Sequence, residues 1–469
     1  MSVARIDKNL FGLYCVYAMI IIGAMTLPSV VEMILCLIGG VYTAIEVWNG
    51  YVKDKVEICC YGVVFPIIIS CFQNIYLGIA ANKINRMEMQ VLLSLHFLFV
   101  LTFIIISMVK GLAEYELKWL LYTIMFLVLV AGTMYIIKPA VITSFISSIR
   151  NLLSCMLFFY YTSILSKKLR VDKYYQVMGI VITIVVLFGF FEYIIGFDVW
   201  HKLNISKLWT LKSIKTNISG IPENWYSSER IGGIQLRRMV SSFADPVNLG
   251  TFLFAAAMVS FYRKKKIIFV LIIICCCLTV SKGAILGVGI FVVILSWYKD
   301  KSKLLSAIVL LIGIILGVVF IEFSKTSSSG SLFAHIRGLT NSFNQLLEHP
   351  MGVGVGNSGV LANLFAVERL DSLVTETGIG SVIAQLGIVG MFTYLYFFVK
   401  LSEIPFKWGE QYNEEKIIYY SILFSFIVNA LFNEVALSPN SCGLYFVELA
   451  VLNASVERWK EIEKDGGIG

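Results

Sequence analysis

The chain has 469 residues, of which 58% are hydrophobic and only 14% charged, with a mean hydropathy of +0.82 and a formal net charge of +8. A soluble domain carries roughly 25% charged residues and could not bury this much apolar surface, so the composition excludes a soluble globular protein. The ten cysteines lie in or beside apolar segments and predict small packing residues rather than a disulfide framework or a metal site.

Long apolar segments predict membrane-spanning helices along most of the chain. A span needs about 20 mostly apolar residues, and continuous apolar character favours helices over a β-barrel. The first span lacks a cleavage site and is expected to remain as a signal anchor. The expected spans are 10–27, 29–48, 56–80, 88–109, 119–137, 140–165, 174–197, 246–262, 267–281, 283–298, 304–321, 372–399, 417–437 and 440–456.

The predicted fold is therefore an all-α, polytopic transmembrane helical bundle of about 12–14 spans. Two hydrophilic segments, each expected to contain short helices, interrupt it. The expected regions are N-terminal transmembrane helices (1–197), a first large outer loop (198–245), central transmembrane helices (246–321), a second large outer loop (322–371), and C-terminal helices with a cytoplasmic tail (372–469). Within the first loop, residues 203–211 predict an amphipathic helix on the membrane surface.

The positions of Lys and Arg predict the orientation. Most of the 38 basic residues lie in one set of connections, and the opposite short connections hold only Lys83, Arg86, Lys138 and Lys282. By the positive-inside rule, the first set and both termini are cytoplasmic, so both large loops face outward. The basic excess is thus a topology signal, and no nucleic-acid partner is expected.

Residues 267–298 could form one tilted helix or a short hairpin of two helices, and the hairpin is preferred because the basic clusters on both sides then stay cytoplasmic. A single helix of that length would measure about 48 Å, against a hydrocarbon core of about 30 Å. We therefore expect a short hairpin with its tip at Ser281-Lys282-Gly283. Lys282 then either points into an outward cavity or extends to the membrane interface, and both interpretations are open.

Ionisable residues inside the expected spans are costly and usually face a bundle interior or a wet cavity. Arg150 and Glu448 fall near mid-depth, where a structural ion pair and a ligand contact by Arg150 are both open. The other ionisable residues, which lie within the expected spans or at their edges, fall toward the outer side and predict a cavity that opens outward. These are Glu32, Glu192, Asp198, Asp245 and Glu434.

The segment Arg237–Gly250 brings two arginines, Asp245 and Asn248 to the mouth of a span. An Arg guanidinium can bind phosphate through two parallel hydrogen bonds, which Lys cannot do. The arginines are therefore candidates for a phosphate-containing ligand, and surface anchoring on lipid headgroups is the alternative.

Four segments together resemble the O-antigen polymerase and O-antigen ligase family of membrane glycosyltransferases (Wzy- and WaaL-like). The first is Arg237–Gly250, and the second is Leu278–Ala284, where Lys282 stands in a place that is commonly Arg. The third is His349–Gly356, and the fourth is Glu376-Thr377 followed by Gln385–Gly390. They occur in the family's order over residues 230–400, and the N-terminal half matches only in hydropathy.

The resemblance implies a metal-independent, inverting transfer between lipid-linked sugars at the outer face of the bacterial cytoplasmic membrane. Family members polymerise undecaprenyl-diphosphate-linked repeats for capsular or O-antigen-type polysaccharide, or ligate the finished glycan to another acceptor. Arginines of the two outer loops are the family's functional residues, which points to Arg237 or Arg238 and to Arg337. Glu376, with Gly387 eleven residues on, stands where the ligase branch has His, which favours a polymerase.

Such a reaction leaves negative charge on a departing diphosphate, which fixed cations stabilise. Arg337 and Arg238 are the predicted catalytic cations, with Lys282 as a further one. The candidates for the proton acceptor are Glu376, Asp245, His335 and His349. The full set of expected substrate-binding residues is Arg237, Asp245, Asn248, Lys282, His349, Gly354, Gly356 and Arg150.

The run Gly352–Gly356 has two open interpretations. Its N–H groups could form a nest that faces phosphate, or its glycines could let the backbone approach a neighbouring helix. No cluster with metal-ligand spacing occurs in the outer loops, so no metal and no cofactor are expected.

Two other functions stay open at this point, a glycan ligase and, from another class, a flippase or transporter of lipid-linked oligosaccharides. The expected partners are the lipid-linked donor and acceptor, membrane lipids, a chain-length regulator and a flippase. A transporter would more often show internal repeats, and none is evident.

Overall fold

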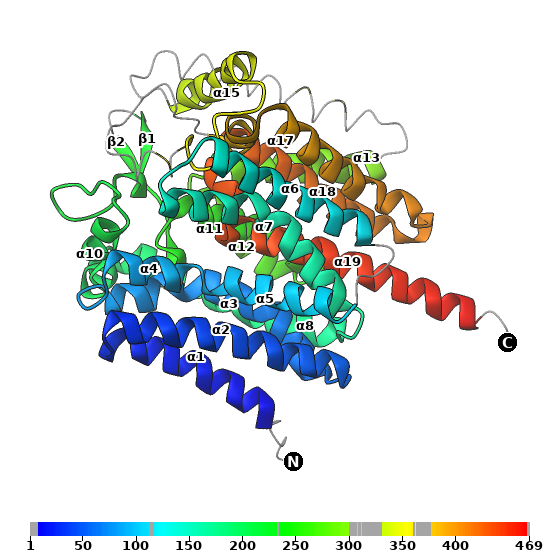
Figure 1. Cartoon of the computed structure of the whole chain (residues 1–469). Coiled ribbons are helices and arrows are strands. Elements are labelled where there is room, and N and C mark those ends of the chain that lie inside the picture. The colour runs from blue at the N-terminus through cyan, green and yellow to red at the C-terminus, as the bar shows by residue number, and fades with distance from the viewer. Residues whose placement is uncertain are drawn as a thin grey trace. The chain divides into compact units, whose positions relative to one another are not determined.

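The computed structural model describes residues 8–111, 117–231, 234–299, 331–359 and 377–466, together with residues 307, 311 and 362. Helices dominate these residues, and one two-stranded antiparallel sheet joins β1 (Tyr226–Ile231) to β2 (Ile234–Arg237) (Figure 1). Nine of the described helices are long and apolar enough to cross a membrane, or ten if one bent pair counts as a span. The chain is therefore a multi-pass, all-α membrane protein.

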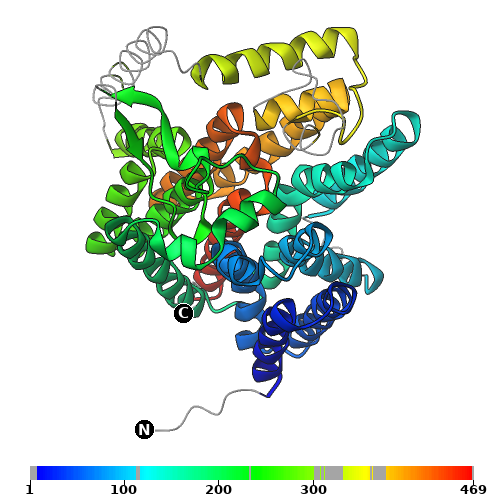
Figure 2. The ribbon, with the colours of Figure 1, turned by 90° about the vertical axis from the view of Figure 1, so that its left-hand side faces the viewer.

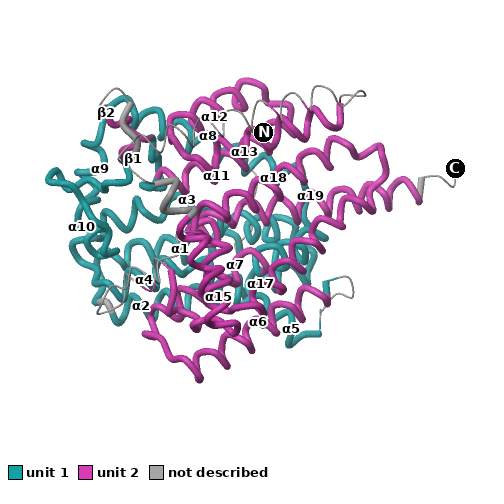
Figure 3. Tube along the Cα trace, turned by 90° about the horizontal axis from the view of Figure 1, so that it is seen from above, with its two compact units in different colours: residues 1–117, 157–225, 239–245 teal, residues 118–156, 226–238, 246–469 magenta. Residues whose placement is uncertain are grey.

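The chain divides into two compact units, which Figure 3 distinguishes by colour. Unit 1 comprises residues 1–117, 157–225 and 239–245, and unit 2 comprises residues 118–156, 226–238 and 246–469. The first hydrophilic segment is thus divided, because Asp245 belongs to unit 1 whereas Arg237, Arg238 and Asn248 belong to unit 2.

Unit 1 is built around α3, whose side chains are largely buried and which contacts α1, α2, α5, α8 and η3. The expected span 88–109 is a bent pair, because α4 and α5 meet at Ser94 with an angle of 51°. Unit 1 contains residues 157–166 of α7 (Ile142–Ser166). Its other elements are α1 (Lys8–Thr26), α2 (Ser29–Val52), α3 (Val56–Ala80), α4 (Arg86–Leu93), α5 (Leu95–Val109), α8 (Val171–Ile195), α9 (Asp198–Lys202), α10 (Ile205–Leu211), η2 (Glu223–Trp225) and η3 (Ser241–Phe243).

The expectation that 203–211 lies on the membrane surface is wrong. Helix α10 buries Ile205, Leu208 and Trp209 inside unit 1, where it contacts α3 and α9. The amphipathic pattern is real, but protein rather than lipid covers its apolar face.

In unit 2, α11 packs against α12 and α19, α13 packs against α18, and α15 lies along α17 (Figure 2). The gap between α12 and α13 confirms two separate helices in place of one long span. The elements are α6 (Lys118–Ile137), α7 (Ile142–Ser166, to residue 156), β1, β2, α11 (Pro246–Tyr262), α12 (Lys266–Leu278), α13 (Lys282–Lys299), α15 (Ser331–Glu348), α17 (Gly378–Glu403), η5 (Pro405–Lys407), η6 (Glu410–Tyr412), α18 (Asn413–Phe432), η7 (Glu434–Leu437) and α19 (Pro439–Gly466).

Every expected span except 304–321 coincides with a helix or with the bent pair. The span 304–321 lies outside the described residues, apart from two isolated positions, and so does the start of the expected span 372–399. Helices α11 and α12 are apolar but shorter than a full span.

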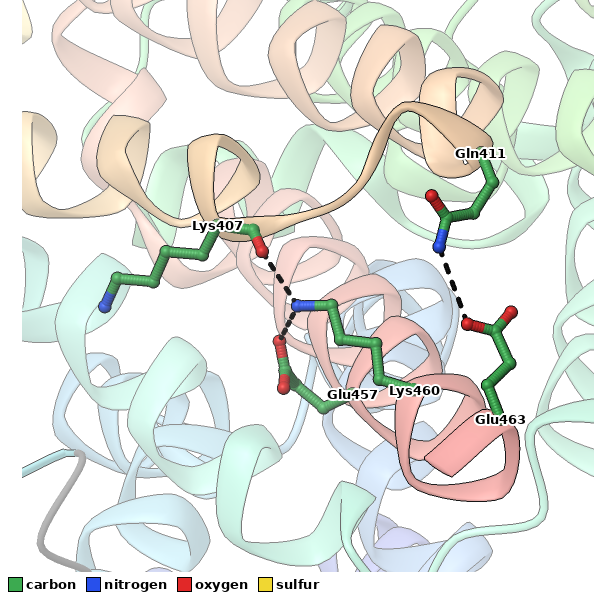
Figure 4. Close-up of polar contacts among 5 residues, drawn as sticks. All are labelled: Lys407, Gln411, Glu457, Lys460 and Glu463. Carbon is green, nitrogen blue, oxygen red and sulfur yellow. Dashed lines mark hydrogen bonds and ion pairs between the residues drawn. The ribbon is translucent and has the colours of Figure 1, made fainter. Parts of the chain in front are cut away.

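Polar contacts fix the C-terminal part of α19 to the link between α17 and α18. Lys460 Nζ donates to Glu457 and to the carbonyl oxygen of Lys407, both at 3.0 Å, and Gln411 Nε2 donates to Glu463 at 3.5 Å (Figure 4). These contacts hold one end of the unit 2 bundle together, far along α19 from its beginning at Pro439.

Candidate functional site

The first two segments singled out in the sequence meet at the break between α12 and α13. Arg238 Nε donates to the carbonyl oxygen of Thr279 at 2.8 Å. Gly250, in the first turns of α11, lies against Thr279 and Ser281 so closely that a Cβ atom would overlap Ser281. Lys282 is half-buried at the first position of α13. Two cationic residues are therefore brought to one helix break.

The third and fourth segments meet inside α17, which is broken at Gly387 (φ 61°, ψ −147°). In an unbroken helix, Ile388 N–H would donate to the carbonyl oxygen of Ala384. Instead Ile388 donates to Pro350 O at 2.9 Å, and Val353 N–H donates to Ala384 O at 2.8 Å. At the break, α17 thus forms hydrogen bonds to residues 349–359, which we name the glycine-rich segment, in place of hydrogen bonds within the helix.

Gln385 fixes this segment with both ends of its side chain. Its Oε1 accepts from Gly356 N–H at 3.0 Å, and its Nε2 donates to Ser358 O at 3.2 Å and to Ser381 Oγ at 2.7 Å. The backbone oxygen of Gln385 accepts from Gly354 N–H at 3.1 Å. A buried amide side chain therefore satisfies irregular backbone that the helix alone would leave unpaired.

These bonds decide between the two interpretations of the glycine run. The N–H groups of Gly354 and Gly356 are both bonded to Gln385, so the phosphate nest expected for them is wrong. The close-approach interpretation is confirmed, since a Cβ atom at Gly352 would overlap the carbonyl oxygen of Gln385.

Residues near the α6–α7 connection complete this docking. Lys138 Nζ donates to Gly352 O at 2.7 Å, and Ser144 Oγ donates to Gly356 O at 2.6 Å. Asn357 Nδ2 in turn donates to Lys138 O at 3.2 Å. Lys138, one of the few basic residues expected on the outer side, thus has a structural role.

Both pairs of segments border the turn between α18 and α19. On the first pair's side, Asn429 lies against Gly283 and donates to Thr251 Oγ1 at 3.2 Å, and Ser441 Oγ donates to Asn248 Oδ1. The second pair's side is equally close, because Gly359 lies against the Glu434 carboxyl group. Helix η7 contacts α11, α17, α18 and α19.

We name residues Asn433–Ser441 the polar turn. Five of its nine residues are Asn, Glu or Ser, yet the sequence prediction treated most of the stretch as the ends of two spans. The signal that could have revealed it is this density of polar side chains between two apolar helices.

In unit 1, the segment Met239–Asp245 is held by hydrogen bonds. Glu192 accepts from the N–H groups of Val240 and Ser241, each at 3.4 Å, and Ser241 Oγ donates to Val185 O at 2.6 Å. Asn74 Nδ2 donates to the carbonyl oxygen of Phe243. The buried Glu192 therefore holds backbone in place in the interior of this unit.

Asp245 accepts from Asn224 Nδ2 at 3.1 Å in unit 1 and lies near the half-buried Lys212. Lys212 Nζ donates to Asn74 Oδ1 at 2.7 Å and lies 4.6 Å from the centre of the Trp209 ring. Burial lowers the pKa of Lys212 to about 8, against the attraction of Asp245, which raises it. Asp245 thus contributes to a lysine network that the sequence did not reveal.

The remaining candidate residues are spread over unit 2. Arg337 and His349 are exposed, on α15 and directly after it. Arg150 is half-buried on α7 and Glu448 is buried on α19, and their pairing stays a prediction. Glu376 and the side chain of His335 lie outside the described residues.

The described part of the chain holds no group of three or more His, Cys, Asp or Glu residues with the geometry of a metal site. No protein-family model and no curated protein matches this sequence. A function must therefore be argued from the residues themselves.

Proposed function

We propose that this protein is a glycosyltransferase of the O-antigen polymerase type, which extends undecaprenyl-diphosphate-linked oligosaccharide at the outer face of the cytoplasmic membrane. The observation that carries the proposal is that the four sequence segments pack together in two pairs within unit 2, apart from residues 239–245 of the first segment. Arg238, Gly250 and the α12–α13 break form one pair, and the glycine-rich segment and α17 form the other.

The chemistry fits the side chains at the first pair. Transfer breaks the bond between the anomeric carbon and a phosphate oxygen, and forms a bond to the attacking sugar hydroxyl with inversion. Negative charge builds on the departing diphosphate, where Arg238 and Lys282 would stabilise it. The bond from Arg238 Nε to Thr279 O orients the guanidinium before substrate arrives. The hydroxyl proton passes to a carboxylate or imidazole, with Glu376 and His349 as candidates.

A reconstituted assay with a lipid-linked repeat tests the proposal. A ladder of lengthening products identifies a polymerase. A single transfer to a different acceptor identifies a ligase, and unchanged lipid on the other leaflet identifies a flippase. Chain extension should continue in EDTA, and a clear metal requirement would contradict the mechanism.

Arginine variants locate the reacting centre in the same assay. Arg337→Ala and Arg238→Ala should each abolish extension, and Arg337→Lys should restore little because two parallel hydrogen bonds are lost. Near-normal polymer from Arg337→Ala would remove that residue from the centre. Labelling of Gly220→Cys and Thr340→Cys from the outer side tests whether both segments face outward.

A flippase is the second candidate, because α17 is broken within a candidate span. Discontinuous helices whose backbone is satisfied by other polar groups are common at the substrate sites of transporters. Lipid transfer across the bilayer without any lengthening would favour this function over a polymerase.

A further inference from the structure

The polar turn combines two features that rarely occur together in a membrane helix bundle. It lies among four helices, since η7 contacts α11, α17, α18 and α19. It also contains three buried atoms that form no hydrogen bond within the described part of the chain, namely Asn433 Nδ2, Ser438 Oγ and Asn440 Oδ1. Buried polar atoms without a partner lower stability, so each needs an explanation.

Ser438 shows that these atoms are not merely helix caps. It directly precedes α19, where a Ser side chain normally accepts a hydrogen bond from the first helical N–H groups. Here the N–H group of Ser441 bonds instead to the backbone oxygen of Ser438 at 3.0 Å, beside the ordinary helical bond from Cys442 N–H to the same oxygen at 2.9 Å. The hydroxyl is therefore not used by the helix that it precedes.

The mixture of groups identifies a class of ligand. Asn433 Nδ2 only donates, Asn440 Oδ1 only accepts, and Ser438 Oγ does both. Glu434, 8% exposed, adds a carboxyl group to the same turn. A phosphate only accepts when it is ionised, and a carboxylate would repel it. Sugar hydroxyls both donate and accept, so they match this set.

Two neighbouring helices, α11 and α18, link the turn to the cationic break. Asn248, bonded to Ser441, and Gly250, packed on Ser281, are two residues apart on α11, which is about 3 Å along the helix axis. Asn429 lies against Gly283, the residue after Lys282. In a sugar diphosphate, one oxygen atom links a sugar, which carries hydroxyl groups, to a negatively charged diphosphate. The polar turn and the cationic break match these two parts.

We propose that the polar turn Asn433–Ser441 is a saccharide-binding element, which contacts hydroxyl groups of the sugar bonded to the diphosphate. The inference deepens the proposed function and rests on it for the identity of the substrate. In this proposal the turn forms hydrogen bonds to the sugar, while Arg238 and Lys282 bind the diphosphate.

Two probes separate these roles in binding measurements on the full-length protein in detergent. The first is the free oligosaccharide released by mild acid from the lipid-linked repeat that accumulates in cells lacking this protein. The second is undecaprenyl diphosphate, which has no sugar. Asn440→Leu should weaken oligosaccharide binding about tenfold and leave undecaprenyl diphosphate binding unchanged. Arg238→Ala should do the reverse.

Thermal unfolding separates a binding role from a structural role, because a variant that removes a structural contact would lower the Tm. Replacing an unpaired buried oxygen by an apolar side chain should leave the Tm of Asn440→Leu unchanged or raise it. Ser438→Ala is too small a change to disturb folding and should weaken oligosaccharide binding about threefold. Ser455→Ala, whose hydroxyl bonds within α19 to Val451 O at 2.8 Å, is the matched control and should bind normally.

The inference is overturned if wild-type protein does not bind the oligosaccharide, or if Asn440→Leu and Ser438→Ala bind it like wild type. Failure of the proposed function looks different. In that case the variants lose oligosaccharide binding as expected, but the reconstituted wild-type protein forms no lengthened product. Normal extension with unaffected turn variants removes the saccharide element and leaves the polymerase standing.

Discussion

The glycine-rich segment 349–359 and the polar turn 433–441 both interrupt apolar helices of unit 2, but they use their polar groups in opposite ways. In the first, backbone groups bond to Gln385, Lys138 and Ser144. In the second, three buried side-chain atoms have no partner within the described residues. The glycine-rich segment thus has a structural role. The polar turn, which the sequence did not single out, has atoms that a ligand could bind, as we propose.

This difference gives a physical criterion for choosing among polar segments of a membrane protein. Mutation of a polar group that is hydrogen-bonded should lower the stability of the protein, because its partner is then left unpaired. Mutation of a buried polar group without a partner should weaken ligand binding but leave the stability unchanged. The following variants test the two halves of the criterion.

The largest effect is expected for Gly387→Ala. Residue 387 has a positive φ, and a Cβ atom there would overlap Pro350 O, so either α17 or the docked segment must move. The free energy of unfolding should fall by at least about 3 kcal/mol. Gly289→Ala on α13 is the control, because its Cβ meets no atom within 4 Å and Ala favours helix. Equal Tm values for the two variants would contradict the docking.

Gln385→Leu should lower the free energy of unfolding by about 2–4 kcal/mol, because it leaves Gly356 N–H and Ser358 O without their partner. Hydrogen exchange of residues 350–358 should accelerate in parallel. Asn440→Leu in the polar turn also replaces an amide side chain by Leu, but it is expected to cause no loss of stability, so the two variants are directly comparable. A stable Gln385→Leu variant with slow exchange would abolish the distinction.

Lys212 is an intermediate case in unit 1, with one strong partner but a costly buried charge. Its folded pKa of about 8 lies below the usual value of 10.5, so the unfolded chain binds more protons between these values. The free energy of unfolding should therefore rise with pH from about 8 to about 10.5, with a slope of up to about 1.4 kcal/mol per pH unit. Below pH 8 this contribution is constant. Chemical unfolding at several pH values should show that Lys212→Met has lost the rise, and an identical rise in the variant would refute the assignment.

The smallest effect is expected for Ser144→Ala, which removes one hydrogen bond to Gly356 O and should lower the free energy of unfolding by about 1 kcal/mol. Ser455→Ala should change it less, because the lost bond lies within a single helix. Thermal unfolding of both variants measures the difference, and a greater loss in Ser455→Ala would run against the expectation.

Hydropathy predicted the helices because a bilayer allows few alternatives for long apolar segments. The length of residues 267–298 and the basic clusters on both sides of them predicted the separation of α12 from α13. Hydropathy could not predict the bend at Ser94 or the break at Gly387, because both depend on which neighbouring backbone supplies the missing hydrogen bonds. The strands β1 and β2 were likewise missed, since the expected first loop gave no clear alternating pattern.

For the candidate site, residue types singled out segments that pack against one another in pairs, but they did not predict the contacts of each residue. A phosphate nest was one of two interpretations of Gly354 and Gly356, yet their N–H groups bond to the backbone oxygen and the side chain of Gln385, about 30 residues later, which no local pattern encodes. Arg238 lies at the break between α12 and α13, and the roles of Arg238, Arg337 and Lys282 all stay predictions.

The break at Gly387 also constrains how the chain is made. Segment 349–359 leaves the ribosome before α17, and Lys138 and Ser144 leave it much earlier. In the folded chain the carbonyl groups of Ala384 and Gln385 accept hydrogen bonds from this earlier segment, which satisfies backbone that hydrocarbon could not. We therefore expect insertion of α17 and burial of the glycine-rich segment to be coupled during biosynthesis.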